Sequence, residues 1–173
     1  TFSGKVQKKP LEMLKALVAF GGDEVTEGQI TDALWPDADG DTARISFKTT
    51  LHRLRQLIGH DEAIRVQEGK VSLDRRYCWT DVWAFERMLE SSEFGVRSSG
   101  LKAQKRQSEI QSLEKTILLY RGHFLPQDED KPWAVSLRER LRNKFLRAVG
   151  ALGESWERSG KLTKAVDCYE KGL

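Results

Sequence analysis

Cysteine is scarce in this sequence of 173 residues, and its scarcity argues against two classes of protein. The two cysteines, Cys78 and Cys168, lie 90 residues apart. Small disulfide-stabilised domains carry many cysteines, and structural zinc sites carry ligands at short spacing. We therefore expect neither a disulfide framework nor a zinc site, and we predict reduced thiols in a cytoplasmic protein.

Long apolar runs are also missing. No stretch approaches the roughly 18 consecutive apolar residues of a membrane-spanning helix, and the first residues do not have the pattern of a signal peptide. We therefore expect no membrane partner. Apolar residues make up 39% of the chain and aromatic residues 9%, enough to fill the core of one ordinary domain or two small ones.

Motifs that carry catalysis or bind metals are absent too. The three histidines do not cluster with either cysteine, and the sequence contains neither a Gly-Lys-Ser/Thr phosphate loop nor a nucleophile elbow. Residues 37–41 have Asp at calcium-loop positions one, three and five, but Thr42 replaces the required Gly and Lys48 the bidentate Glu. We expect no catalytic residue, no metal site and no cofactor.

Acidic residues are missing from one stretch in particular, TARISFKTTLHRLRQLI at 42–58. The whole chain has 26 acidic and 29 basic residues, and residues 23–41 hold seven acids and no base. Apolar or small residues recur in 42–58 at the spacing of one helix face. They are Ala43, Phe47, Leu51, Leu54 and Ile58. The pattern predicts a helix with one buried face and an outer surface whose charges are all positive.

The outer face of this predicted helix suits the major groove of DNA. His52 and Gln56 can hydrogen-bond base edges, and the methyl groups of Ile45 and Thr49 can contact thymine methyl groups. The basic side chains can neutralise phosphates. The alternative is a solvated basic face, because some helices lack acids by chance.

The elements around this helix have the order of a winged helix-turn-helix. Helices are predicted in KPLEMLKALVAFGG (9–22), which stops at Gly21–Gly22, and in TEGQITDALW (26–35), where Thr26 and Gln29 have capping-box spacing. Val25 is expected to form a short strand. Apolar and polar residues alternate in 64–74 on both sides of a turn at Glu68–Gly69, which predicts a β-hairpin. Arg65 and Lys70 on this hairpin can hold phosphate beside the groove, although surface hairpins commonly carry such residues.

Residues 80–173 show no strand pattern. Helices are predicted at 81–91, 103–121, 133–158 and 162–172. The last pair has tetratricopeptide-repeat spacing at Leu152, Gly153, Trp156, Gly160, Ala165 and Tyr169. Because such repeats need neighbours, we expect further helices after this pair in the parent protein.

Four tryptophans at helix starts or on apolar faces favour core packing or domain contact. They are Trp79, Trp83, Trp133 and Trp156.

Several short motifs together resemble a known family. The segments ALWPD, LHRLRQLIG, VSLD and CWTDVWAFE, followed by LLYRGHFLP and PWAVSLRERLRNKFLRAV, span nearly the whole chain. They are similar to an OmpR-type winged helix joined to a bacterial transcriptional activator domain, as in the Streptomyces antibiotic regulatory protein family. The resemblance implies a transcriptional regulator whose helical domain supports dimerisation or contact with RNA polymerase.

The sequence therefore predicts a mainly α protein with a small β component: a winged helix-turn-helix at 1–78 and a tetratricopeptide-like helical domain at 79–173. We predict a sequence-specific DNA-binding transcriptional activator that partners with double-stranded DNA. The residues predicted to contact DNA are Arg44, Ile45, Lys48, Thr49, His52, Arg53, Arg55, Gln56, Arg65 and Lys70. The alternative is a protein-interaction module in which the winged helix docks on an acidic partner and the helical repeat binds a peptide.

Overall fold

The computed structural model describes residues 8–96 and 103–173, which form two compact units. Of the described residues, the first unit contains those up to Trp79 together with Asp128–Leu137. The second unit contains Thr80–Gln127 and Arg138–Leu173.

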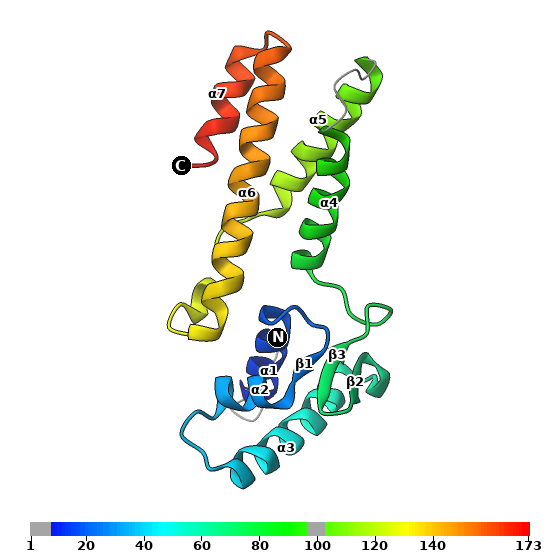
Figure 1. Cartoon of the computed structure of the whole chain (residues 1–173), viewed down its shortest axis with the longest axis vertical. Coiled ribbons are helices and arrows are strands. Elements are labelled where there is room, and N and C mark those ends of the chain that lie inside the picture. Colours follow the sequence, from blue (N-terminus) through cyan, green and yellow to red (C-terminus); the bar gives the residue numbers. More distant parts are fainter. Residues whose placement is uncertain (1–7, 97–102) are drawn as a thin grey trace. The chain divides into compact units, whose positions relative to one another are not determined.

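Three helices and a small sheet form the part of the first unit that precedes Thr80 (Figure 1). In chain order they are α1 (Lys8–Ala19), β1 (Val25–Thr26), α2 (Glu27–Leu34), α3 (Gly40–Ile58), the 3-10 turn η2 (Asp61–Ala63), β2 (Ile64–Gln67) and β3 (Lys70–Leu73). This order confirms the predicted helices, the short strand at Val25 and the hairpin. The first four residues, TFSG, lie outside the described residues.

The sheet has the antiparallel strand order β1-β3-β2. Val25 pairs with Val71, and Ile64 pairs with Leu73. The hairpin turns at Glu68 and Gly69, whose φ angles of 51° and 73° both lie in the left-handed region. Two consecutive left-handed residues are what a tight hairpin turn requires. This hairpin is the wing of the winged helix.

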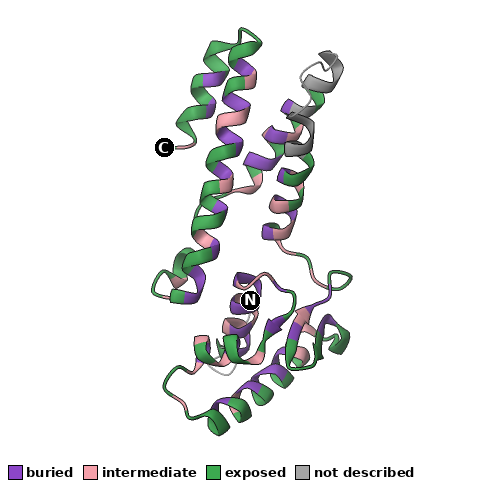
Figure 2. Cartoon of the chain, viewed as in Figure 1, coloured by how far each residue is buried: buried purple, intermediate pink, exposed green. Residues whose placement is uncertain are grey.

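The core of the first unit lies between the three helices and the sheet, where buried residues face inward (Figure 2). Its fully buried side chains include Met13, Leu17, Ile30, Leu54 and Ile64. The predicted capping box starts α2: the Gln29 backbone N–H donates to the Thr26 hydroxyl, and the Thr26 N–H donates to the Gln29 side chain. Such caps fix where a helix begins and so where its faces point.

The second unit is built from helices α4 (Asp81–Val96), α5 (Ala103–Leu119), α6 (Pro132–Arg158, from Arg138 onward) and α7 (Leu162–Glu170), with the short 3-10 turn η3 (Pro126–Asp128) after α5. Helices α4 and α5 pack on each other. Helices α6 and α7 form a hairpin in which the Cys168 thiol donates to the Val149 carbonyl at 3.5 Å. Trp156 is buried there, beneath Lys161 and Lys164.

The predicted fold class is confirmed, with differences in detail. Helix α4 continues through Gly95 to Val96, beyond the predicted end at residue 91, and the rest of the predicted break at 95–100 lies outside the described residues. Trp133 and Trp156 are buried as expected. The prediction of core packing is wrong for Trp79, which is 71% exposed. Its position just before α4 does not bring it into either core.

Candidate nucleic-acid interface

Helix α3 carries most of the predicted site, and its two ends are well defined. Asp39 starts the helix by accepting hydrogen bonds from the Thr42 N–H at 2.9 Å and the Thr42 hydroxyl at 2.8 Å. These bonds lower the pKa of Asp39, the backbone bond most. Gly59 ends the helix with φ at 78°, a conformation that glycine adopts without steric cost. The register of α3 against the core is therefore set at both ends.

The faces of α3 separate as predicted. Ala43, Phe47, Leu51 and Leu54 are buried, and Ile58 is half-buried. Thr50 is also buried, with 6% exposed, which the apolar pattern did not predict. It lies three residues after Phe47 and four before Leu54, so helical spacing alone places it on the inner face.

The opposite face presents six of the predicted residues to solvent (Figure 2). They are Ile45, Lys48, Thr49, His52, Arg53 and Gln56. Ile45 is 67% exposed although it is apolar. Lys48 and Arg53 form no ion pair with any other residue that the structure describes. This surface therefore offers cations whose charge is not neutralised inside the protein.

His52 and Gln56 contact each other on this face. The Gln56 amide nitrogen lies 3.1 Å from Nε2 of His52, one helical turn away. An amide nitrogen can only donate, so the contact requires an unprotonated Nε2 that accepts. In this arrangement the pair is pre-oriented, and the Gln56 carbonyl oxygen remains available as an acceptor.

Two predicted residues of α3 are engaged within the protein. The Arg44 Nε lies 3.9 Å from the Glu27 carboxylate of α2, a long and exposed ion pair. Arg55 is half-buried, and its guanidinium donates to the Ile64 carbonyl at 2.8 Å. Arg55 thus joins the end of α3 to the start of β2. The sequence predicts that Arg55 contacts phosphate, whereas in the structure its guanidinium holds the wing.

The two predicted cations of the wing are paired with acids. Lys70 lies 3.2 Å from the Glu24 carboxylate, and the Arg65 Nε lies 3.6 Å from the Asp74 carboxylate. Asp74 is buried and also binds Arg76, at 2.7 Å. The hydrogen bond from the Arg76 side chain is the main reason why the pKa of Asp74 falls to about 2. The wing therefore presents much less free positive charge than α3.

The partners of these cations were missed by sequence reasoning. Glu24 is far from Lys70 in the sequence, and only the pairing of β1 with β3 brings them together. The Asp74–Arg76 pair is local: the Arg76 backbone N–H also donates to the Asp74 carboxylate at 2.9 Å. An Asp followed two residues later by Arg at the end of a strand was the available signal for that turn.

Groups for other chemistry are absent from the part of the chain that the structure describes. His, Cys, Asp and Glu side chains there form no group of three or more that could hold a metal ion. Among the same residues, no helix is long and apolar enough to cross a bilayer.

The fold defines a winged-helix protein in which a helical domain follows along the chain, and comparisons with known proteins agree. Residues 80–172 match the model of the bacterial transcriptional activator domain. The chain belongs to this family, which is one of transcriptional regulators and not a class of enzymes. The predicted resemblance is thereby confirmed.

Among solved structures, the chain is similar to Mycobacterium tuberculosis EmbR in complex with a low affinity phosphopeptide. The TM-score is 0.70 at 18% sequence identity, which supports the same fold. The match covers 92% of this chain and 42% of that chain, so the protein described here spans less than half the length of that structure. No curated protein matches the sequence.

Proposed function

We propose that the chain is a sequence-specific DNA-binding transcriptional activator and that α3 occupies the major groove. One observation carries the proposal: α3 follows α2 as the second helix of a winged helix-turn-helix, and Lys48 and Arg53 on its exposed face form no ion pair with the other described residues. In this class of fold the second helix of the motif enters the groove. The family of the helical domain fits the same role.

In this proposal the residues divide by role. Lys48 and Arg53 contact phosphates and so position the helix, whereas His52, Gln56, Thr49 and Ile45 meet the base edges. Arg44 reaches phosphate at the start of α3. Arg55 supports the interface through its bond to the start of the wing. Arg65 and Lys70 contact phosphate beside the groove, in competition with the carboxylates of Asp74 and Glu24. The second unit contributes contacts to RNA polymerase or to a second copy of the chain.

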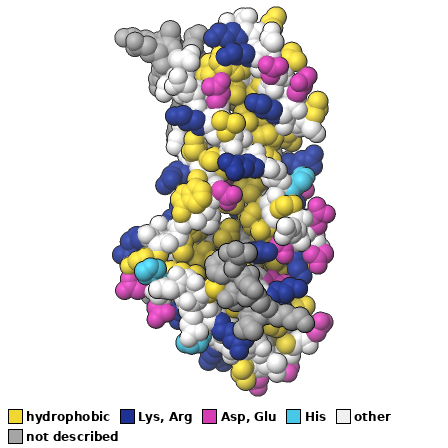
Figure 3. Space-filling view, turned by 180° about the vertical axis from the view of Figure 1, so that it is seen from behind, with side chains coloured by type: hydrophobic (Ala, Val, Ile, Leu, Met, Phe, Trp, Pro, Cys, Tyr) yellow, Lys and Arg dark blue, Asp and Glu magenta, His cyan; other side chains and the backbone are white. Residues whose placement is uncertain are grey.

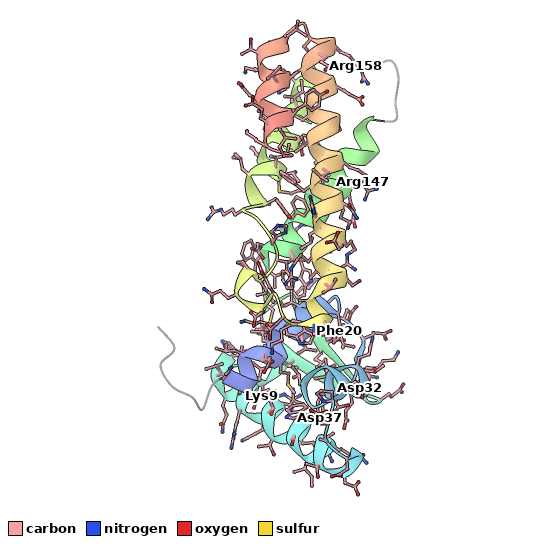
Figure 4. All side chains as sticks on the ribbon, turned by 90° about the vertical axis from the view of Figure 1, so that its left-hand side faces the viewer. Lys9, Phe20, Asp32, Asp37, Arg147 and Arg158 are labelled. Carbon is pink, nitrogen blue, oxygen red and sulfur yellow. The ribbon has the colours of Figure 1, made fainter. Side chains whose placement is uncertain are left out.

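A salt titration of binding to duplex DNA tests the proposal. The logarithm of the binding constant falls with the logarithm of salt concentration in proportion to the number of phosphates contacted. We expect Arg53→Ala or Lys48→Ala to weaken binding on all sequences and to reduce this slope by about one. The matched control is Arg147→Ala, an exposed arginine of α6 in the second unit (Figure 4).

The proposal would be contradicted if the DNA-binding constant of the wild-type chain did not change with salt concentration. Such a result would favour instead a module that binds protein, with the basic face of α3 docking on an acidic partner. The EmbR structure in complex with a phosphopeptide makes a phosphopeptide a reasonable probe for that case.

A further inference from the structure

A pocket of about 330 Å³ lies within the second unit, away from α3. Its lining comes from the start of α4, the segment between α5 and η3, and one residue of α6. Val82, Phe85, Tyr120, Phe124 and Leu141 supply an apolar and largely aromatic wall. The volume lies at the lower end of the range for small-molecule sites, which suits a compact ligand.

Contacts with neighbouring residues of the second unit hold the wall of the pocket in place. Tyr120 stacks on Phe145 with 4.3 Å between ring centroids. The Arg138 Nε donates to the Phe124 carbonyl at 3.2 Å, which ties the segment between α5 and η3 to α6. Leu125 has a φ of 50°, which a leucine rarely adopts, so this segment is held in a strained form. The pocket is therefore pre-formed.

Two charged side chains line the pocket, and their situations differ. The Asp81 carboxylate accepts the Val82 backbone N–H at 2.8 Å and so is engaged at the start of α4. Arg121 is exposed and makes no hydrogen bond or ion pair with the other described residues. The uncommitted charge of the pocket is therefore positive. Hydrophobic and basic side chains also adjoin on the surface of this unit in Figure 3.

We propose that this pocket binds a small carboxylate with an aromatic or aliphatic body. The body would fill the space against Phe85, Tyr120 and Leu141, where burying apolar surface is favourable. The carboxylate would lie at the rim and accept paired hydrogen bonds from the Arg121 guanidinium, whose planar fork matches a carboxylate. All these residues belong to the second unit, so the inference does not depend on DNA binding by α3.

Two probes with the same body test the proposal on the whole chain: 3-phenylpropionate and its neutral analogue 3-phenylpropanol. Binding is measured by backbone amide NMR titration up to millimolar concentration. We expect 3-phenylpropionate to bind about tenfold more tightly than 3-phenylpropanol, because only the carboxylate can make a charge-assisted hydrogen bond with Arg121. The largest shifts should fall on residues 81–85 and 119–126.

The variant Arg121→Gln should bring the two probes within about twofold of each other, since it keeps the apolar wall and removes the charge. Arg147→Gln, an exposed arginine of the same unit outside the pocket, should leave the tenfold difference intact. The proposal is overturned if neither probe binds, if both bind equally well to the wild type, or if the shifts lie elsewhere.

Discussion

His52 and Gln56 illustrate how one contact changes the interpretation of two residues. Both were predicted to hydrogen-bond base edges, and the structure places them 3.1 Å apart, where they share a hydrogen bond. A residue held by its neighbour loses less conformational entropy on binding DNA than a free one. We therefore expect the two to act as one reading unit.

Replacing His52 or Gln56 with alanine should reduce affinity for the preferred site by about 1–3 kcal/mol and relax preference at one or two base positions. The double variant should cost less than the sum of the two, because each change already disturbs the partner. Selection of random duplexes at fixed salt, followed by binding to the preferred site, measures both effects. Gln111→Ala on α5 is the exposed control. Additive losses would show that the pair does not act as a unit.

The ion pair between Lys70 and Glu24 leads to a prediction of opposite sign. Because the Glu24 carboxylate lies 3.2 Å from the Lys70 ammonium, it competes with phosphate for that cation. Glu24→Gln should strengthen nonspecific DNA binding by about two- to fivefold, the range of an exposed ion pair. Lys70→Ala should weaken binding less than Arg53→Ala. Fluorescence anisotropy on random duplexes measures the DNA affinity of each variant, with Glu90→Gln on α4 as the control. Unchanged affinity in Glu24→Gln would place the wing away from DNA.

Helices α6 and α7 approach closely because a glycine meets a tyrosine. A Cβ atom at Gly153 would overlap the ring of Tyr169, whose hydroxyl donates to Glu157 at 3.2 Å. Gly150, also on α6, has no atom within 4 Å of such a Cβ. Two glycines of one helix therefore differ in whether a neighbouring helix occupies the space.

Gly153→Ala and Gly150→Ala should change stability in opposite directions. Alanine in a helix interior is favoured over glycine by up to about 1 kcal/mol, and Gly150→Ala should show this gain. Gly153→Ala should lose about 1–3 kcal/mol relative to Gly150→Ala, because Tyr169 must move away. Urea unfolding of both variants measures the difference. Equal effects would mean that Tyr169 shifts freely and that the close approach does not hold the hairpin together.

The first unit is built from two separate parts of the chain. Lys15 on α1 lies 2.6 Å from Asp128, and Glu12 lies 3.5 Å from Lys131. Both partners belong to the segment Asp128–Leu137, which is assigned to this unit. Within that segment Trp133 and Leu137 are buried. The first unit therefore contains this segment in addition to the residues up to Trp79.

A chain ending at Trp79 should therefore unfold at a lower temperature than the same residues do in the whole protein. Losing as little as about 1 kcal/mol shifts the midpoint of a domain of this size by about 4–8 °C. Hydrogen exchange of the α1 amides during heating follows this unit in both chains. As a matched test, Lys15→Ala should destabilise the whole protein and have little effect on the short chain. Equal midpoints would show that the second segment adds nothing to the winged helix.

Sequence patterns were sufficient for the local elements. The capping box at Thr26 and the glycine at position 59 marked helix ends, because caps and left-handed turns depend on one or two residues. The spacing from Ala43 to Leu54 predicted the buried face of α3 for a similar reason: a helix repeats every 3.6 residues whatever surrounds it. The exposed half of the candidate site follows directly from that spacing.

Which cations of the candidate site are free to bind a ligand depends on contacts between residues that are distant in the sequence. Whether Lys70 is free depends on Glu24, which reaches it only through pairing of β1 with β3, and Arg55 is drawn inward by the Ile64 carbonyl. The sequence by itself determined which helix is basic, since composition and periodicity are local properties. Only the tertiary structure decided which cations remain unpaired, because electrostatic partners are chosen by distance in space and not by separation along the chain.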